Sequence, residues 1–400
     1  MLPLGLSAHQ RQLFHRALRE SHTVVPTVQV MNMDRKRLAD VSLRLIDGSV
    51  NVTNDADTTR GCSLSLYDPN GAIALDSNDP SDGAMYLDNA VKVILSYHSP
   101  TFPASMGWVN VPVFCGPVTS VNRDADTLAV EAQGWEARLR TAVWEPKSWW
   151  IQYTTDMIRW LLRLAGETRI DVPDLKILTT EEVSLHRSAQ FWNHAQKLAR
   201  SLDRQLFYDG RGVARLRRLP SNRVWTFRDG DAGDMTTKPR VSFDLENARN
   251  IVWVRGRKPK GATERVNGWA RLPAGNPLSP QRLGRNGRPA YLLETVDNDH
   301  IKTNRDAHEL AVKLVNERAR QAVSVEFDAM PVPHLDPGDL VRVDSGDWMQ
   351  DFRIYRYSIP IGVGDSMSVG YTRRMLKGRK ARSRPIQPMY LSTWGEATIG

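Results

Sequence analysis

Two stretches of the chain alternate apolar and polar residues with a period of two, and a stretch with helical spacing lies between them. The first stretch covers residues 23–134 and the second covers 249–375. Successive side chains of a strand point to opposite faces of a sheet, so this alternation indicates strands with one buried face. Turn-forming clusters at residues 68–71 and 334–339 divide the runs. Each stretch is therefore predicted to form a closed or strongly curved antiparallel β module.

The first module is predicted to hold six or seven strands. Apolar residues at 41, 43 and 45 are followed by Asp47-Gly48 and then by Val50 and Val52. Because Asp-Gly is a frequent two-residue hairpin turn, we expect residues 47–48 to connect two strands. The second module is predicted to end in alternating strand runs at 323–327, 340–343 and 352–357, divided by turns at 334–339 and 345–347.

Helical spacing appears in four segments. Residues 7–21 read as a short amphipathic helix behind a Ser cap, and 156–166 and 188–206 read as two helices of a middle domain. Residues 303–322 read as a helix just before the last strands. Five tryptophans crowd the middle domain, and such density favours a core or an interface: Trp144, Trp149, Trp150, Trp160 and Trp192.

These patterns predict an α+β, multi-domain chain. The expected parts are an N-terminal helix (1–22), a first β module (23–134), a helical or α+β middle domain (135–248), a second β module (249–375) and a basic tail (376–400). Residues 256–289 within the second module are rich in Gly and Pro, so we expect a long functional or flexible loop there.

Composition supports a large folded protein. The chain has 400 residues, of which 41% are hydrophobic, enough for two to four domains. No long apolar run and no signal-peptide pattern occur, so we expect synthesis in the cytosol of the producing cell and no membrane span. Cys62 and Cys115 are the two cysteines, and both are expected to be buried thiols rather than a bridge.

The formal charge of +9 is unevenly distributed. Residues 249–290 hold ten Lys or Arg against Glu264, and 366–384 hold seven Lys or Arg and no acid, so the rest of the chain is mildly acidic. Single-sign segments are usually solvated, although they can also contact phosphates or acidic protein surfaces. As a hypothesis, the basic loop around 257–288 contacts an acidic patch of a neighbouring protein. No ladder of aromatic residues accompanies the basic tail, which weakens a nucleic-acid interpretation.

Catalytic and metal-binding motifs are absent. No zinc-protease, zinc-finger or serine-hydrolase pattern occurs, and the pairs His186/His194 and His300/His308 lack a third ligand at a suitable spacing. The acidic clusters 229–234 and 297–299 lack the closing Glu of a calcium loop, so turn formation explains them better. Asp347-Trp348 is interpreted as a hairpin tip. We therefore predict no catalytic, cofactor-binding or metal-binding residue and no enzyme activity.

The order of these parts resembles the hub proteins of phage tail tips and baseplates, in particular minor tail proteins of phages with long non-contractile tails that infect actinobacteria. The likeness covers residues 20–375 and includes 21–24 before the first strand, 276–280 in the long loop and 335–341 before a late strand. Each motif is weak alone, and their order carries the resemblance.

The resemblance implies a structural role. It implies two barrel-like tail-tube modules flanking the helical domain, three copies forming a ring, and contacts with the distal tail protein, the tape measure protein and tip or fibre proteins. The expected location is the tail tip of the virion, with roles in host attachment and genome delivery, and with DNA meeting the protein only on its way through the channel. Since no lytic signature is found, a hub without its own enzyme is expected.

Two other classes are left open by the sequence. A wall-binding or wall-degrading tail-associated protein would use tryptophan faces as sugar platforms, and it would bind host peptidoglycan. A nucleic-acid-binding protein would use the basic segments, and its affinity would fall steeply with salt. The hub interpretation ranks first, the wall-active protein second and the nucleic-acid binder third.

Overall fold

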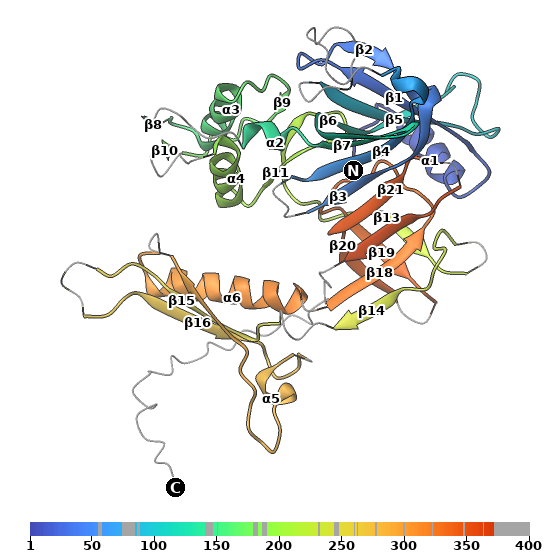
Figure 1. Cartoon of the computed structure of the whole chain (residues 1–400). Helices are drawn as coiled ribbons and strands as arrows, with labels where there is room; N and C mark the ends of the chain where they lie inside the picture. The colour runs from blue at the N-terminus through green and yellow to red at the C-terminus, as the bar shows by residue number, and fades with distance from the viewer. Residues whose placement is uncertain are drawn as a thin grey trace.

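In the part of the chain that the structure describes, the strands gather into one large sheet and several small ones, and six α-helices accompany them (Figure 1). The structure is a computed structural model. It describes residues 1–54, 58–73, 85, 89–140, 147–149, 151–178, 183–185, 190–230, 233–243, 248–259, 261, 263–276, 278–298, 301–321, 323–346, 349–362 and 364–371. Within this part the chain is mixed α+β and mostly β, which confirms the predicted class.

Seven strands of the first β module lie in the described residues, which agrees with the predicted six or seven. They are β1 (Thr23–Met31), β2 (Arg37–Asp40), β3 (Leu45–Thr53), β4 (Arg60–Tyr67), β5 (Ala90–His98), β6 (Val109–Asp124) and β7 (Thr127–Gln133). Their order in the sheet is β3-β4-β7-β6-β5-β1-β2, with antiparallel neighbours. The long strand β6 pairs with β5 along its first half and with β7 along its second, so the sheet bends across it.

The expected hairpin turn at Asp47-Gly48 is wrong. Residues Ser42–Arg44 form a short 3-10 helix, and β3 runs through 47–48 with a bulge between Leu45 and Asp47. A Cβ added to Gly48 would lie 2.8 Å from the carbonyl oxygen of Ser63 on β4. This glycine is therefore needed for the close approach of two strands, a role that a turn-type pattern does not reveal.

Of seven further described strands, four extend the same sheet. The seven are β13 (Arg223–Arg228), β14 (Arg240–Phe243), β18 (Val323–Ala329), β19 (Leu340–Asp344), β20 (Met349–Arg353), β21 (Arg356–Pro360) and β22 (Met367–Tyr371). The order β14-β18-β22-β21 continues into β3, because β21 pairs with β3 with Ile359 opposite Val50. The result is an eleven-stranded sheet, and β13-β19-β20 form a separate three-stranded layer.

The prediction of closed barrels is not met within the described residues. The edge of β3 that would have to close the first module is occupied by β21, so the two groups of strands merge into one open sheet. One hydrophobic core serves both groups: it contains Val93 and Phe114 of the first group and Phe227, Val341 and Phe352 of the second. The two groups therefore pack as one body, and the domain boundaries drawn from the sequence stay predictions.

Helix α1 (Ala8–Ala17) packs onto this body. Its Ser7 cap accepts a hydrogen bond from the Gln10 amide, and the Gln10 side chain accepts one from the Ser7 amide, which is a capping box. Phe14 is fully buried, and its ring lies 5.6 Å from Tyr97 and 5.3 Å from His334. The predicted docking of this helix is explained by these contacts.

The middle region is a small α+β layer beside β6. Its elements are α2 (Glu136–Leu139), β8 (Lys147–Trp149), α3 (Thr154–Leu164), β9 (Ile170–Asp171), β10 (Val183–Leu185), α4 (Phe191–Ser201), β11 (Gln205–Tyr208) and β12 (Ala214–Arg217). Its core includes Met31, Ala90 and Cys115 from the first module together with Trp135 and Trp192. Trp192 belongs to this core and Trp160 packs against it, which confirms the core alternative of the prediction for these two; the side chains of Trp144, Trp149 and Trp150 lie outside the described part of the chain.

Residues 248–321 form a third unit, at lower left in Figure 1. It contains β15 (Ile251–Arg255), β16 (Asn267–Arg271), α5 (Pro280–Leu283), β17 (Leu293–Asp297) and α6 (Asn304–Gln321). The sheet order is β16-β15-β17. The expected long loop 256–289 therefore holds a strand and a helical turn, and β16 pairs with β15 over its whole length.

This unit is inserted into a β-hairpin. Strands β14 and β18 are antiparallel neighbours, and Phe243 lies directly opposite Val323. The unit has its own hydrophobic core, formed entirely by residues between Ala248 and Ala319. We refer to residues 248–321 as the inserted unit and to the rest of the described chain as the body.

Two further expectations concern cysteines and membranes. Cys62 and Cys115 are buried and free, which confirms the predicted pair of thiols. Among the described helices, none combines the length and the apolarity that a membrane crossing requires.

Candidate functional site

A buried cluster of charges lies where the parts of the body meet. The turn predicted at 334–339 places Asp336 and Asp339 side by side, and both carboxylates are fully buried. The turn is tight because Gly338 has φ +83°, and the Asp336 amide donates to an Asp339 oxygen at 2.9 Å. Two anions are thereby held together just before β19.

Cations from three other parts of the chain neutralise this pair. Arg60 of β4 contacts Asp336 (Nη2 to Oδ1, 3.0 Å), and Arg217 of β12 contacts Asp339 (Nη1 to Oδ1, 3.1 Å). The amino group of Met1 lies 2.7 Å from Asp339. We name these five residues the charge junction. It joins the first module, the middle region and the late strands at one point.

Electrostatics keep the junction charged. Burial by itself would raise the pKa of Asp336, but the Met1 amino group, Arg217, Arg60 and Arg215 outweigh burial and lower the pKa to about 2. Arg60 is 2% exposed, and it also donates to the carbonyls of Tyr208 and Val113. Buried charges of this kind are tolerated only when they are paired and hydrogen-bonded. The junction therefore works as an internal clamp.

A second polar link fastens the middle region to the first module. Arg35 contacts Glu167 (Nη2 to Oε2, 2.7 Å) and lies over the Trp135 ring at 4.1 Å. The Tyr208 hydroxyl donates to the same Glu167 oxygen at 2.6 Å. Nearby Glu136 is fully buried and accepts from the amide of Tyr208, and burial raises the pKa of its carboxyl.

A histidine pair joins α1 to the turn at 334–339. The Nε2 atoms of His15 and His334 are 3.0 Å apart, and the Trp225 ring packs edge-on against His15 at 5.1 Å. Burial, with Arg19 and Arg11 nearby, lowers the pKa of His15 to about 4. Burial and the neighbouring His15 lower the pKa of His334 well below its usual range. Both pKa shifts favour neutral rings, so one imidazole can donate to the other across this contact, with the direction set by the tautomer.

The metal-like patterns of the sequence do not assemble into a site within the described residues. No group of three or more His, Cys, Asp or Glu side chains is close enough there to hold an ion. In the 229–234 cluster, Asp234 accepts from Trp225 Nε1 at 2.7 Å and from the Arg228 amide at 2.6 Å, so it acts as a structural acceptor.

The remaining candidate residues are spread out. Asp297 of the 297–299 cluster contacts Arg255 at 2.7 Å. His308 contacts the Trp269 carbonyl at 2.9 Å. His186, His300, Asp347, Trp348 and the basic run 377–384 lie outside the described residues. The prediction that the chain has no catalytic, cofactor or metal residue stays a prediction.

Comparison with known proteins identifies the fold. No family model and no curated protein matches the sequence. The 43 kDa tail protein of prophage MuSo2 from Shewanella oneidensis is similar in structure, with a TM-score of 0.60 and 11% identity over 87% of this chain and 98% of that one. A tail protein from Neisseria meningitidis MC58 has a TM-score of 0.60 and 10% identity over 86% and 95%. A chain of a PdpA–VgrG complex has a TM-score of 0.50 and 8% identity over 88% and 64%.

These likenesses show the fold. The chain has the fold of phage tail proteins, and the resemblance predicted from its sequence is confirmed at that level. The junction itself escaped the sequence analysis: the Pro-Gly-Asp turn was singled out, but Arg60 lies more than 270 positions away in the chain. Arg60 falls on the buried-face positions of β4 together with Cys62, Leu64 and Leu66, and an arginine in such a row is the signal that could have pointed to it.

Proposed function

We propose that this chain is a structural hub of a phage tail tip or baseplate. The observation that carries the proposal is a fold shared with two phage tail proteins over nearly the whole chain. In this role three copies form a ring between the tail tube with its distal tail protein and tape measure protein, and the tip or fibre proteins. The ring belongs to the virion, is made in the host cytoplasm, and serves host attachment and genome delivery.

The construction of the body supports this role. An eleven-stranded sheet with one shared hydrophobic core, cross-linked by the ion pairs of the charge junction, is suited to act as a rigid subunit. Among the described residues the sheet ends in two strands, β2 and β14, and no further described strand pairs with their outer edges, where a neighbour could add. Obligate rings bury large faces of such rigid subunits. The proposal assigns no catalytic step and no cofactor to the chain.

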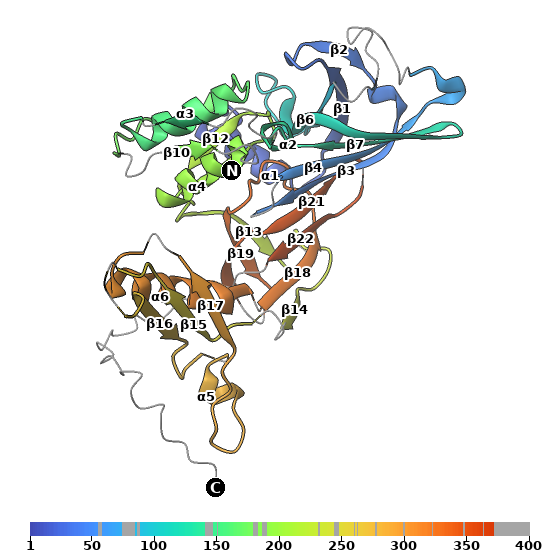
Figure 2. The same ribbon diagram turned by 60° about the vertical axis from the view of Figure 1, so that its left-hand side comes forward.

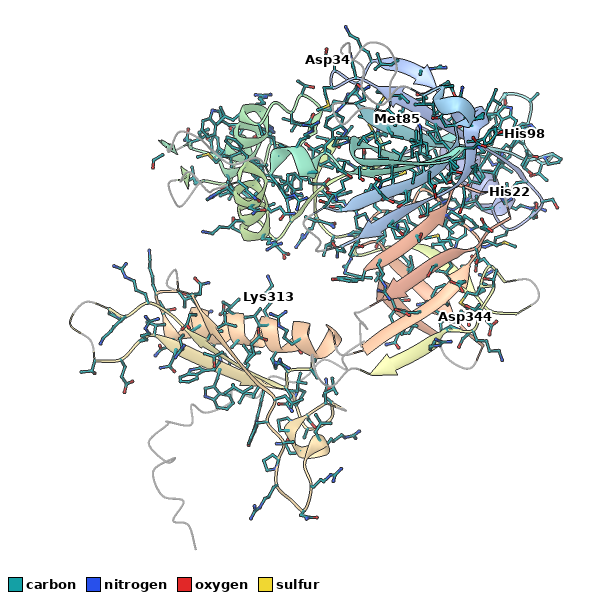
Figure 3. The ribbon with its side chains drawn as sticks, viewed as in Figure 1. His22, Asp34, Met85, His98, Lys313 and Asp344 are labelled. Carbon is teal, nitrogen blue, oxygen red and sulfur yellow. The ribbon has the colours of Figure 1, made fainter. Side chains whose placement is uncertain are left out.

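A wall-binding role is the second candidate. One observation favours it: Trp108, in the connection after β5, is 48% exposed and its ring lies 5.2 Å from that of His98, which is labelled in Figure 3. Exposed aromatic planes can stack on sugars. Pull-down on host peptidoglycan by the full chain and by Trp108→Ala would identify this role.

The first experiment is light scattering on the purified full chain, alone and mixed with the tail protein encoded beside it. The expected result is a trimer, formed either by the chain alone or with that partner. A stable monomer that ignores the partner and binds peptidoglycan would replace the hub by the wall-binding role.

A further inference from the structure

The inserted unit has one covered and one open sheet face. On the covered face Val252 and Val254 pack against Ala307 and Ala311 of α6. A Cβ added to Gly268 of β16 would lie 2.3 Å from the His308 amide, so α6 sits directly on this strand. Because side chains alternate along a strand, the residues between these point to the other face.

The open face is built of three rows across the sheet. The register places Arg271, Ile251 and Leu293 in one row, Trp269, Trp253 and Thr295 in the next, and Asn267, Arg255 and Asp297 in the third. Leu293 is 53% exposed. Two half-buried tryptophans lie directly opposite each other, next to half-buried Ile251 and exposed Leu293, and form an apolar centre on the side of the sheet away from α6.

A basic arm leaves this face at its first row. Residues 272–292 connect β16 to β17, carry α5, and project away from the body in Figure 2. At their tip Arg285 lies opposite Arg288 across Asn286 and Gly287, whose φ values are +53° and +74°. Positive φ at both central residues defines the stiff two-residue turn of hairpins.

The tip holds like charges together without an opposing one. Residues directly opposite across a hairpin lie about 5 Å apart, and like charges there are unfavourable. Arg282, Arg285 and Arg288 are exposed and form no ion pair with the described residues. The two acids of β17 are already paired, since Asp297 contacts Arg255 and Glu294 contacts Arg318. The arm is therefore short of negative charge.

We propose that the open face and the arm together form a docking surface for another tail protein, whose contact surface has an apolar centre and an acidic patch. Tryptophan and arginine are the residues most enriched at the energetic centres of protein interfaces. A linear polyanion fits less well: the free arginines occupy one end of the face, Arg255 is neutralised by Asp297, and Ile251 and Leu293 offer nothing to a phosphate or a sugar acid. This inference rests on the proposed hub function.

The test uses the full chain and each purified tail protein encoded next to it, with binding measured by calorimetry at low and moderate salt. One variant is Arg282→Glu/Arg285→Glu/Arg288→Glu, and a second is Leu293→Glu, which changes only an exposed side chain. The matched control is Lys302→Glu/Arg305→Glu/Lys313→Glu, the same charge change at three exposed residues in and just before α6, of which Lys313 points away from the sheet in Figure 3.

We expect one neighbouring protein to bind. Both face variants should weaken that binding at least about tenfold, and higher salt should weaken it as well. The control variant should bind like the unchanged chain. Equal binding by tip variant and control overturns the proposal, as does the absence of any binding neighbour. If short single-stranded DNA or polyphosphate binds in place of a tail protein, the docking proposal is overturned in favour of a polyanion site. If the inserted units of two copies associate with each other, the proposal is overturned in favour of self-association. Light scattering on each variant separates these results from the hub itself, whose failure would appear as loss of the trimer in every sample, including the control.

Discussion

The body and the inserted unit differ in where their ion pairs lie. In the body the important charges are buried: Arg60, Asp336 and Asp339 are each at most 2% exposed. In the inserted unit the ion pairs are partly or largely exposed, as with Arg255 and Asp297. A buried ionic cluster fixes parts in one geometry, whereas exposed pairs contribute little. The comparison indicates that the body relies on buried ion pairs to fix its internal geometry, whereas the inserted unit does not.

The largest effect should follow from opening the charge junction. Asp336→Asn leaves Arg60 buried beside a neutral side chain, and we expect a loss of about 3–5 kcal/mol in the free energy of unfolding. Glu309→Gln, which removes an exposed i,i+4 partner of Arg305 in the inserted unit, is expected to cost less than about 0.5 kcal/mol. Urea unfolding of the full chain measures both, and similar losses would remove the contrast between the two regions.

A smaller effect should follow from a glycine at the contact between the middle region and β6. A Cβ added to Gly210 would lie 2.1 Å from the Pro112 carbonyl oxygen, so Gly210→Ala must push two backbones apart. We expect a loss of about 1–3 kcal/mol. Gly275→Ala in the inserted unit meets nothing within 4 Å and is the control. Unchanged thermal stability of Gly210→Ala would show that this contact is not tight.

Acid should weaken the body through the histidine pair. The folded chain lowers the pKa of His15 to about 4, against about 6.5 in an unfolded chain, so the unfolded chain binds the proton first. The stability that depends on neutral His15 is therefore present above pH 6.5 and is lost as the pH falls toward 4. Glu136, whose pKa burial raises, has the opposite slope. The difference between the unchanged chain and His15→Gln isolates the histidine, and parallel pH profiles would contradict this account.

The smallest effect on the body should come from the largest deletion. Replacing residues 244–322 by Asn-Gly joins Phe243 to Val323, which already lie opposite each other, so we expect the body to unfold within about 1 kcal/mol of the full chain. Excising 154–201 is the contrast: it removes α3 and α4 from a core that they share with Met31 and Trp135. An aggregated product of the first deletion, judged by circular dichroism and light scattering, would show that the unit is not independent.

Local patterns predicted the elements well. Helices α3, α4 and α6 follow from apolar spacing, and most strands of the first module follow from alternation, the exception being residues 41–45, where a 3-10 helix leads into β3. What local patterns could not reveal is pairing between distant segments. The pair β3–β21 joins Val50 to Ile359 and turns two expected barrels into one sheet, and the hairpin that holds the inserted unit depends on a contact between Phe243 and Val323.

The β3–β21 pair also constrains how the protein is made. On a ribosome, β3 emerges long before β21, and the edge that β21 will occupy stays unpaired until almost the whole described chain has been synthesised. Sheets that depend on such distant pairings form late, and until then their unpaired strand edges can associate with other chains. Pairing of β3 with β21 therefore competes with pairing of the open β3 edge to a wrong strand until translation is complete. A truncated product that ends before residue 356 is expected to aggregate.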